Sequence, residues 1–146
     1  MSSVLPLIAC VSLQLDVSPP KTYAPVLPPF LAEAWQSDYC VIFDFDNFST
    51  PDLPQYAARL QSEAAASWVH LHLHQAEAPL GPIRKYLQSL YHFDKPLVVA
   101  FSGVAAPPML QRLLSPFGNR LLLSPDADVL AHNWTAFYAL HTPSHN

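Results

Sequence analysis

The sequence predicts an α/β fold in which residues 1–146 form one domain, a three-layer α/β/α sandwich with about five mainly parallel strands. Short apolar runs with strand character alternate along the chain with amphipathic stretches at helical spacing. Strands separated by single helices need crossover connections, and such connections favour parallel pairing. A chain of 146 residues that is 51% apolar is also long enough to bury one core.

The amino-terminal part of the chain predicts two strands, one helix and an extended connection. Residues 5–15 form an apolar run with strand character. Residues 16–29 contain five prolines, which remove backbone donors and fix φ, so we expect an extended connection there. A helix is expected over residues 29–36, because proline is favoured in a first helical turn. Residues 39–45 are an apolar run that ends in acid, as expected of a strand buried on both faces.

A second, amphipathic helix is expected over residues 51–66. Thr50 precedes it as the expected N-cap, and Asp52 lies in its first turn. Its predicted buried face consists of residues that recur at helical spacing. These residues are Leu53, Tyr56, Ala57, Leu60 and Ala64.

The remaining residues predict three strands and three helices in alternation. We expect the helix that begins at Pro107 to end before Gly118, because a left-handed C-cap is unstrained only for glycine. The predicted strands cover residues 68–74, 96–101 and 121–123, and the predicted helices cover residues 81–91, 107–117 and 127–140.

Charged residues are scarce, at 12% of the chain, and the balance of 7 basic against 11 acidic residues gives a net charge of −4. Few charges therefore remain to solubilise the surface, so we expect a protein partner to cover part of it. A protein that grips phosphates normally carries a basic patch, and none is visible in the sequence. This argues against strong direct binding of nucleic acid.

The predicted location is the cytoplasm. No apolar run approaches the ~20 residues of a membrane span, so no membrane association is expected. Cys10 and Cys40 both lie in apolar, strand-like runs. They are interpreted as small buried residues of a reducing compartment, with a disulfide as the alternative.

An acidic pair ends the second predicted strand. Asp44 and Asp46 are two residues apart, so both carboxylates can lie on one side of the strand and bind Mg²⁺. The run 41–48 resembles the first motif of haloacid-dehalogenase phosphatases, and also the start of NYN-type nucleases. Residues 124–128 add to the second resemblance.

Those resemblances imply a Mg²⁺-dependent phosphoryl-transfer enzyme that uses Asp44, Asp46, Asp126 and Asp128. The alternative interpretation is structural: Asp46 and Asn47 form an Asx-type turn, and Asp126 caps a helix. We favour the structural interpretation, which leaves the chain without a metal or other cofactor.

Three histidines alternate with apolar residues in one predicted strand. His70, His72 and His74 therefore share a face, and imidazoles spaced in this way can bind zinc. However, His70 and His74 would lie roughly 13 Å apart along a strand, too far to share one ion. The simpler interpretation is a set of half-buried histidines beneath a helix or on an edge strand, so no metal site is predicted.

The carboxyl-terminal half resembles the uracil-DNA glycosylase superfamily over residues 82–90, 95–106 and 134–140. The resemblance implies an α/β fold. In that family a histidine supports the leaving uracil at the position occupied here by Ser124, and the glycine-rich loop that carries the water-activating residue has no counterpart. The resemblance therefore does not imply glycosylase activity.

The Ser-Pro turn at residues 124–125, Leu130 and the aromatic terminal helix resemble the psi-type subunits of the bacterial DNA polymerase III clamp loader. This resemblance implies a non-catalytic replication accessory protein that holds a protein partner. The contact residues would be Trp134, Phe137 and Tyr138, with the proline-rich residues 19–29 as the alternative. The prediction is thus a protein-binding module, with the phosphoryl-transfer enzyme as the alternative.

Overall fold

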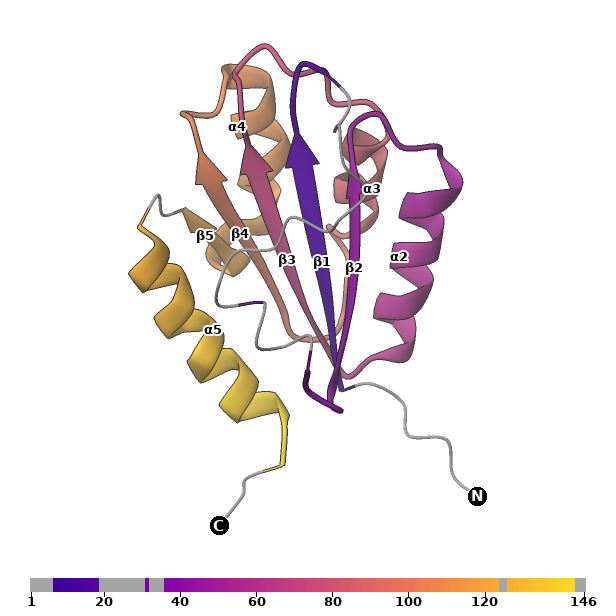
Figure 1. Cartoon of the computed structure of the whole chain (residues 1–146), viewed down its shortest axis with the longest axis vertical. Coiled ribbons are helices and arrows are strands. Elements are labelled where there is room, and N and C mark those ends of the chain that lie inside the picture. Colours follow the sequence, from indigo (N-terminus) through magenta and orange to yellow (C-terminus); the bar gives the residue numbers. More distant parts are fainter. Residues whose placement is uncertain (1–6, 19–30, 32–35, 124–125, 144–146) are drawn as a thin grey trace.

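A five-stranded, wholly parallel sheet forms the centre of the computed structural model, which describes residues 7–18, 31, 36–123 and 126–143 (Figure 1). The strand order is β2-β1-β3-β4-β5. The predicted α/β fold is therefore confirmed, and the first predicted strand lies inside the sheet. The strands are β1 (Ile8–Leu15), β2 (Cys40–Asp46), β3 (Ala66–Leu73), β4 (Leu97–Gly103) and β5 (Leu121–Leu123).

Helices cover both faces of the sheet, so the three-layer arrangement is also confirmed (Figure 1). Helices α2, α3 and α4 pack on one face and α5 packs on the other. The helix predicted over residues 29–36 and the connection over 16–29 lie almost wholly outside the described residues. The helices are α2 (Asp52–Glu63), α3 (Ile83–Ser89), α4 (Pro108–Leu114) and α5 (Ala127–His141), and the 3₁₀ helix η1 (Ser115–Arg120) follows α4.

The alternation of side chains along each inner strand produces two separate cores. In β3, Val69 and Leu71 face α2, α3 and α4, whereas Trp68 faces α5. The side chains of both cores are buried, because β1 and β3 have neighbouring strands on either side and lie between helical layers. Cys10 and Cys40 form no disulfide, and both belong to the core beneath α5.

Helix α2 differs from its prediction in its length and in its buried face. It begins after Pro51, and the hydroxyl of Thr50 donates to the Asp52 carboxylate instead of capping the helix. Tyr56, predicted to be buried, is exposed. The buried face is rotated because Gln61 is drawn into the interior, where it accepts a hydrogen bond from the Tyr86 hydroxyl at 2.6 Å.

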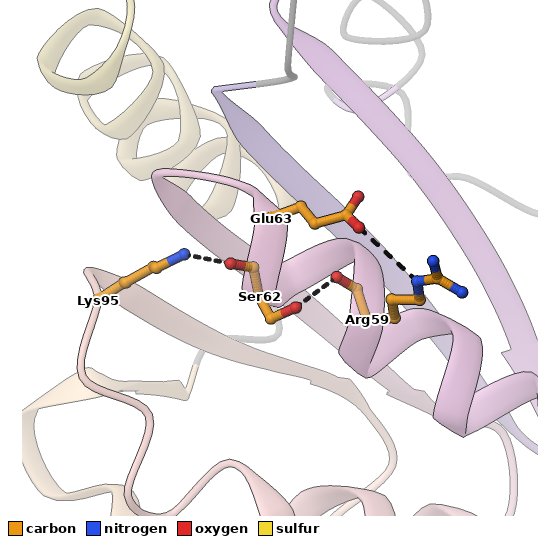
Figure 2. Close-up of polar contacts among 4 residues, drawn as sticks. All are labelled: Arg59, Ser62, Glu63 and Lys95. Atoms are coloured by element: carbon orange, nitrogen blue, oxygen red, sulfur yellow. Dashed lines mark hydrogen bonds and ion pairs between the residues drawn. The ribbon is translucent and has the colours of Figure 1, made fainter.

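A lysine from the loop before β4 caps the carboxyl end of α2 (Figure 2). The Lys95 ammonium group donates to the carbonyl of Ser62 and, at 2.7 Å, to that of Ala64. These carbonyls have no partner within the helix, and a cation there complements the helix dipole. The neighbouring pair Arg59–Glu63, at 3.7 Å, is exposed and contributes little.

The helix predicted over residues 107–117 is divided in two. Helix α4 ends at Leu114 and the chain continues as η1, which includes Gly118 with a positive φ of 58°. The remaining predicted elements are confirmed to within a few residues at each end. Within the described ranges, the helices are all too short or too polar to cross a bilayer.

Gly103 ends β4 in a conformation that side-chain-bearing residues rarely adopt, with φ at 106°. A Cβ atom at this position would lie 2.1 Å from the carbonyl oxygen of Leu73 on the neighbouring strand. We expect Gly103→Ala to lower the free energy of unfolding by about 3 kcal/mol, because strain and a backbone clash add together. Urea denaturation followed by circular dichroism measures the change.

Gly118→Ala is the matched control, since its φ is also positive but a Cβ atom there would meet nothing within 4 Å. It should cost only the strain of placing alanine at φ 58° and ψ −125°, about 2 kcal/mol. If Gly103→Ala and Gly118→Ala lowered the free energy of unfolding equally, the clash between a Cβ atom at residue 103 and the Leu73 carbonyl would not be the cause.

Candidate functional site

The strand order creates a topological switch point between β1 and β3. The chain passes from β1 to β2 on one side, crosses to β3 on the other, and then continues outward through β4 and β5. The connections that leave β1 and β3 therefore diverge at the carboxyl end of the sheet. In open parallel sheets, ligands bind in the crevice formed at such a point.

The face of the sheet that α5 covers changes from apolar to polar along the strands. Near the amino ends of the strands it presents Cys10 and Trp68, which pack beneath α5. Two residues further along, the register places Ser12 beside His70, and two residues beyond these it places His72 between Gln14 and Ser102. The switch point is thus lined by polar side chains on a sheet whose other positions are mostly apolar.

These side chains form two hydrogen-bonded groups, one centred on Ser102 and the other on Gln14. The Ser102 hydroxyl lies 2.8 Å from His70 Nε2 and 2.8 Å from His72 Nδ1. His74 Nε2 donates to Gln14 Oε1 at 2.6 Å, and Gln14 Nε2 donates to the Ser12 hydroxyl at 3.4 Å. We refer to these six residues, Ser12, Gln14, His70, His72, His74 and Ser102, as the switch-point network.

The histidines of the switch-point network differ in their contact with solvent. His70 is buried, His72 is half-buried and His74 is exposed. Burial, together with the charge of His72, lowers the pKa of His70 to about 4. Burial and the charge of His74 also lower the pKa of His72. At neutral pH His70 is therefore a neutral imidazole, able to donate one hydrogen bond and accept another.

The sequence predicted the shared face of the three histidines, but it missed their partners. Ser102 is 30 residues from His72 in sequence and meets it only through the pairing of β3 with β4. The signal available in the sequence was a serine at the end of an otherwise apolar strand. The interpretation of His70, His72 and His74 as edge-strand residues is wrong, because β3 is the middle strand of the sheet.

The acidic pair lies on the same face of the sheet but at its edge. Asp44 and Asp46 both belong to β2, where Asp44 pairs with Ser12 of β1 and Asp46 pairs with Gln14. Partial burial, with a contribution from the charge of Asp46, raises the pKa of Asp44. The Asp46 carboxylate accepts a hydrogen bond from the backbone N–H of Phe48 at 2.7 Å, which is the expected Asx-type turn.

The other two acids considered for an enzyme lie at the opposite edge. Asp126 caps α5, and its carboxylate accepts a hydrogen bond from the backbone N–H of Asp128 at 2.8 Å. Both follow β5, which is four strands away from β2, or about 19 Å at the usual strand spacing. The fold therefore does not bring the four acids together. In the described part of the chain, no three His, Cys, Asp or Glu side chains are grouped to hold a metal ion.

Asn47 holds three carboxyl-end loops together. Its buried side chain accepts from the backbone N–H of Asp16 at 3.2 Å and donates to the carbonyl of Asp16 at 2.8 Å. It also donates to the carbonyl of Pro79. This asparagine thus joins the loops that follow β1, β2 and β3, and it has a structural role.

The aromatic residues expected to contact a partner are largely internal. Trp134 is 5% exposed and Phe137 is 8% exposed, because both rings pack edge-on against Trp68 in the core beneath α5. The Tyr138 hydroxyl lies 2.8 Å from the Ser37 hydroxyl. Trp134 and Phe137 are therefore buried and Tyr138 is half-buried, whereas a contact with a partner requires exposed side chains. Residues 19–29, the alternative contact segment, lie outside the described residues.

An apolar cavity of about 570 Å³ opens at the carboxyl end of β4 and β5, on the side of the sheet that α4 covers. Ser102 lines its rim, while the Ser102 hydroxyl bonds to His70 and His72 of the switch-point network on the other face. The cavity is lined by side chains from the end of β4, from α4 and from β5, and these are mostly apolar. The apolar members are Phe101, Val104, Ala105, Ala106, Leu114, Leu121 and Leu123.

Comparison of this chain with protein-family models, with curated proteins and with solved structures found no match. The resemblances to the glycosylase superfamily and to psi-type subunits therefore stay predictions. The function has to be inferred from the chemistry of the residues described above.

Asn47→Ala should lower the free energy of unfolding by about 2 kcal/mol, because it removes three hydrogen bonds made by a buried side chain and leaves partly buried backbone groups of Asp16 without this partner. Asn133→Ala is the control, since the Asn133 side chain makes one exposed bond to the carbonyl of Val129 and should cost under about 0.5 kcal/mol. Chemical denaturation of both variants tests the assignment. A loss at Asn47 as small as that at Asn133 would contradict it.

Proposed function

We propose that this chain is a non-catalytic protein-binding domain that holds an extended apolar segment of its partner at the carboxyl end of β4 and β5. The observation that carries the proposal is the apolar cavity at this corner of the sheet. Two of its lining residues are unusually exposed for their type: Val104 at 42% and Leu123 at 63%. Exposed apolar side chains around a cavity are typical of a site that a partner covers.

The edge of the sheet at this corner supports an extended partner. β5 is only three residues long and, within the described residues, pairs with β4 alone. An edge strand offers unpaired backbone donors and acceptors, to which an extended segment can add as a further strand. The backbone would then supply affinity, and an apolar side chain placed in the cavity would supply specificity.

The placement of the acids supports a binding role over phosphoryl transfer. A phosphoryl-transfer site built from all four acids needs their carboxylates around the same metal centre. Here Asp44 and Asp46 are separated from Asp126 and Asp128 by the width of the sheet. The Asp46 and Asp126 carboxylates already accept backbone hydrogen bonds that shape a turn and a helix start.

The resemblance to psi-type subunits suggests the first partner to test, a chi-type subunit of the clamp loader. In this proposal the chain is a replication accessory protein located in the cytoplasm, and it acts without a cofactor. The identity of the partner and the location of the contact surface are separate proposals. The first is tested by binding to a chi-type subunit and the second by substitution of a residue at the cavity.

We expect Leu123→Asp to abolish partner binding, because a buried carboxylate in the apolar cavity costs several kcal/mol. Leu140→Asp is the matched control: Leu140 is 77% exposed, lies near the end of α5 and is not among the residues that line this cavity. Quantitative affinity capture with the wild type and both variants identifies a protein that only Leu123→Asp loses. Calorimetry with that purified protein, and separately with a chi-type subunit, then measures the dissociation constant.

Two results would contradict the proposal. The first is equal binding by the wild type and Leu123→Asp. The second is saturable Mg²⁺ binding together with phosphate-ester hydrolysis that Asp44→Asn abolishes, which would establish the phosphoryl-transfer enzyme instead. Loss of binding to the chi-type subunit alone would dismiss that partner and leave the contact surface standing.

A further inference from the structure

The proposed contact surface does not use the histidines at the open end of β3. His72 lies in β3 and is half-buried, and His74 directly follows the strand and is exposed. The His74 backbone still bonds to Leu15 of β1, and its ring contacts Gln14 and His72, so both rings lie on the same side of the sheet. Paired imidazoles in this arrangement reach solvent from a rigid strand. Elsewhere on the described surface, His92 and His132 are exposed but lie on separate elements.

Each of the two rings is held through one of its nitrogens. His74 Nε2 donates to Gln14 Oε1, since an amide oxygen only accepts, so the lone pair of His74 lies on Nδ1. His72 uses Nδ1 for its 2.8 Å hydrogen bond with Ser102, which leaves Nε2 as its outer nitrogen. Histidines that bind metals are held in the same way, because the second ring nitrogen is fixed by an oxygen of the outer shell.

The spacing of the two rings fits a shared ion. A metal about 2.0–2.1 Å from an imidazole nitrogen lies about 3.2 Å from the ring centroid, so two rings on one ion have centroids about 4.5–5.3 Å apart. The His72 and His74 centroids are 4.5 Å apart. The rings meet edge to face at 77°, so the exposed His74 has to turn about its side-chain bonds to direct a nitrogen at the ion, and this turn exchanges its hydrogen bond with Gln14 for the metal.

We propose that His72 and His74 bind one late first-row divalent metal ion at the carboxyl end of β3, with Ser102 as the positioning residue that orients the His72 ring. His70 is too far along the strand to be a ligand, since it lies roughly 13 Å from His74. The remaining coordination positions are therefore occupied by water. Asp46 lies in register with His72 but two strands away, about 10 Å at the usual strand spacing, and adds a weak negative potential at this end of the sheet. Among the ions of this class, Cu²⁺ should bind more tightly than Zn²⁺.

The test is titration of the untagged full chain with Zn²⁺ and with Cu²⁺ in a metal-free buffer, followed by calorimetry. The wild type should bind one equivalent, and His72→Gln and His74→Gln should each weaken binding at least tenfold. His132→Gln, which changes an exposed histidine on α5, should leave the affinity unchanged. Electron paramagnetic resonance of the Cu²⁺ complex should show two nitrogen ligands in the wild type and one in either ligand variant.

Ser102→Ala separates an oriented site from a chance pair of surface histidines. It keeps both ligands, so two nitrogens should still be seen, while the affinity should fall about tenfold or more through loss of the outer-shell hydrogen bond. Far-ultraviolet circular dichroism of each variant establishes that it is folded. No binding by the wild type, or equal affinity in His72→Gln and His132→Gln, would overturn the proposal.

Discussion

The structure depends on the burial of β1 and β3 on both faces and along both edges. Each of these strands has parallel neighbours on either side and helices above or below, so every polar side chain within them needs an internal partner. An unpaired polar group at such a position costs about 1–3 kcal/mol. This constraint decides which polar residues the two strands can carry, and it explains why those that occur belong to hydrogen-bond networks.

Two such networks occupy opposite faces of the sheet, and they differ in character. On the face covered by α2 and α3, Gln61 donates to the Ser67 hydroxyl at 2.7 Å, and Ser67 donates to the carbonyl of Ala9 at 2.9 Å. This network is closed within the protein and ties α2 to β1 and β3. The switch-point network on the other face instead opens to solvent through His72 and His74. Only the second network can exchange its partners for a ligand, which is why the candidate site lies there.

The loops around the switch point give the site a rigid frame. Asn47 fixes the loops after β1, β2 and β3, and the backbone N–H of Val104 donates to the carbonyl of Leu73 at 3.0 Å, which holds the turn after β4 against β3. Asp46 serves the same frame, since its carboxylate accepts from the backbone N–H of Phe48 and shapes the turn after β2. A carboxylate whose lone pairs hold a turn is less available for a metal, and this explains how a motif with the appearance of a phosphatase signature can be structural.

The sequence by itself determined the alternation of strands and helices and the shared face of the three histidines. Both follow from local periodicity, because a strand repeats every two residues and a helix every 3.6. It also identified the structural role of Asp46 and Asp126, since turns and helix caps are local. Tertiary structure alone decided what these elements meet. Pairing of β3 with β4 brought Ser102 to His70 and His72, and strand order separated Asp44 from Asp126. Packing of α5 on Trp68 buried Trp134 and Phe137, two of the three aromatic residues expected at the surface. Such contacts join residues far apart in the chain, and periodicity carries no information about which strands become neighbours.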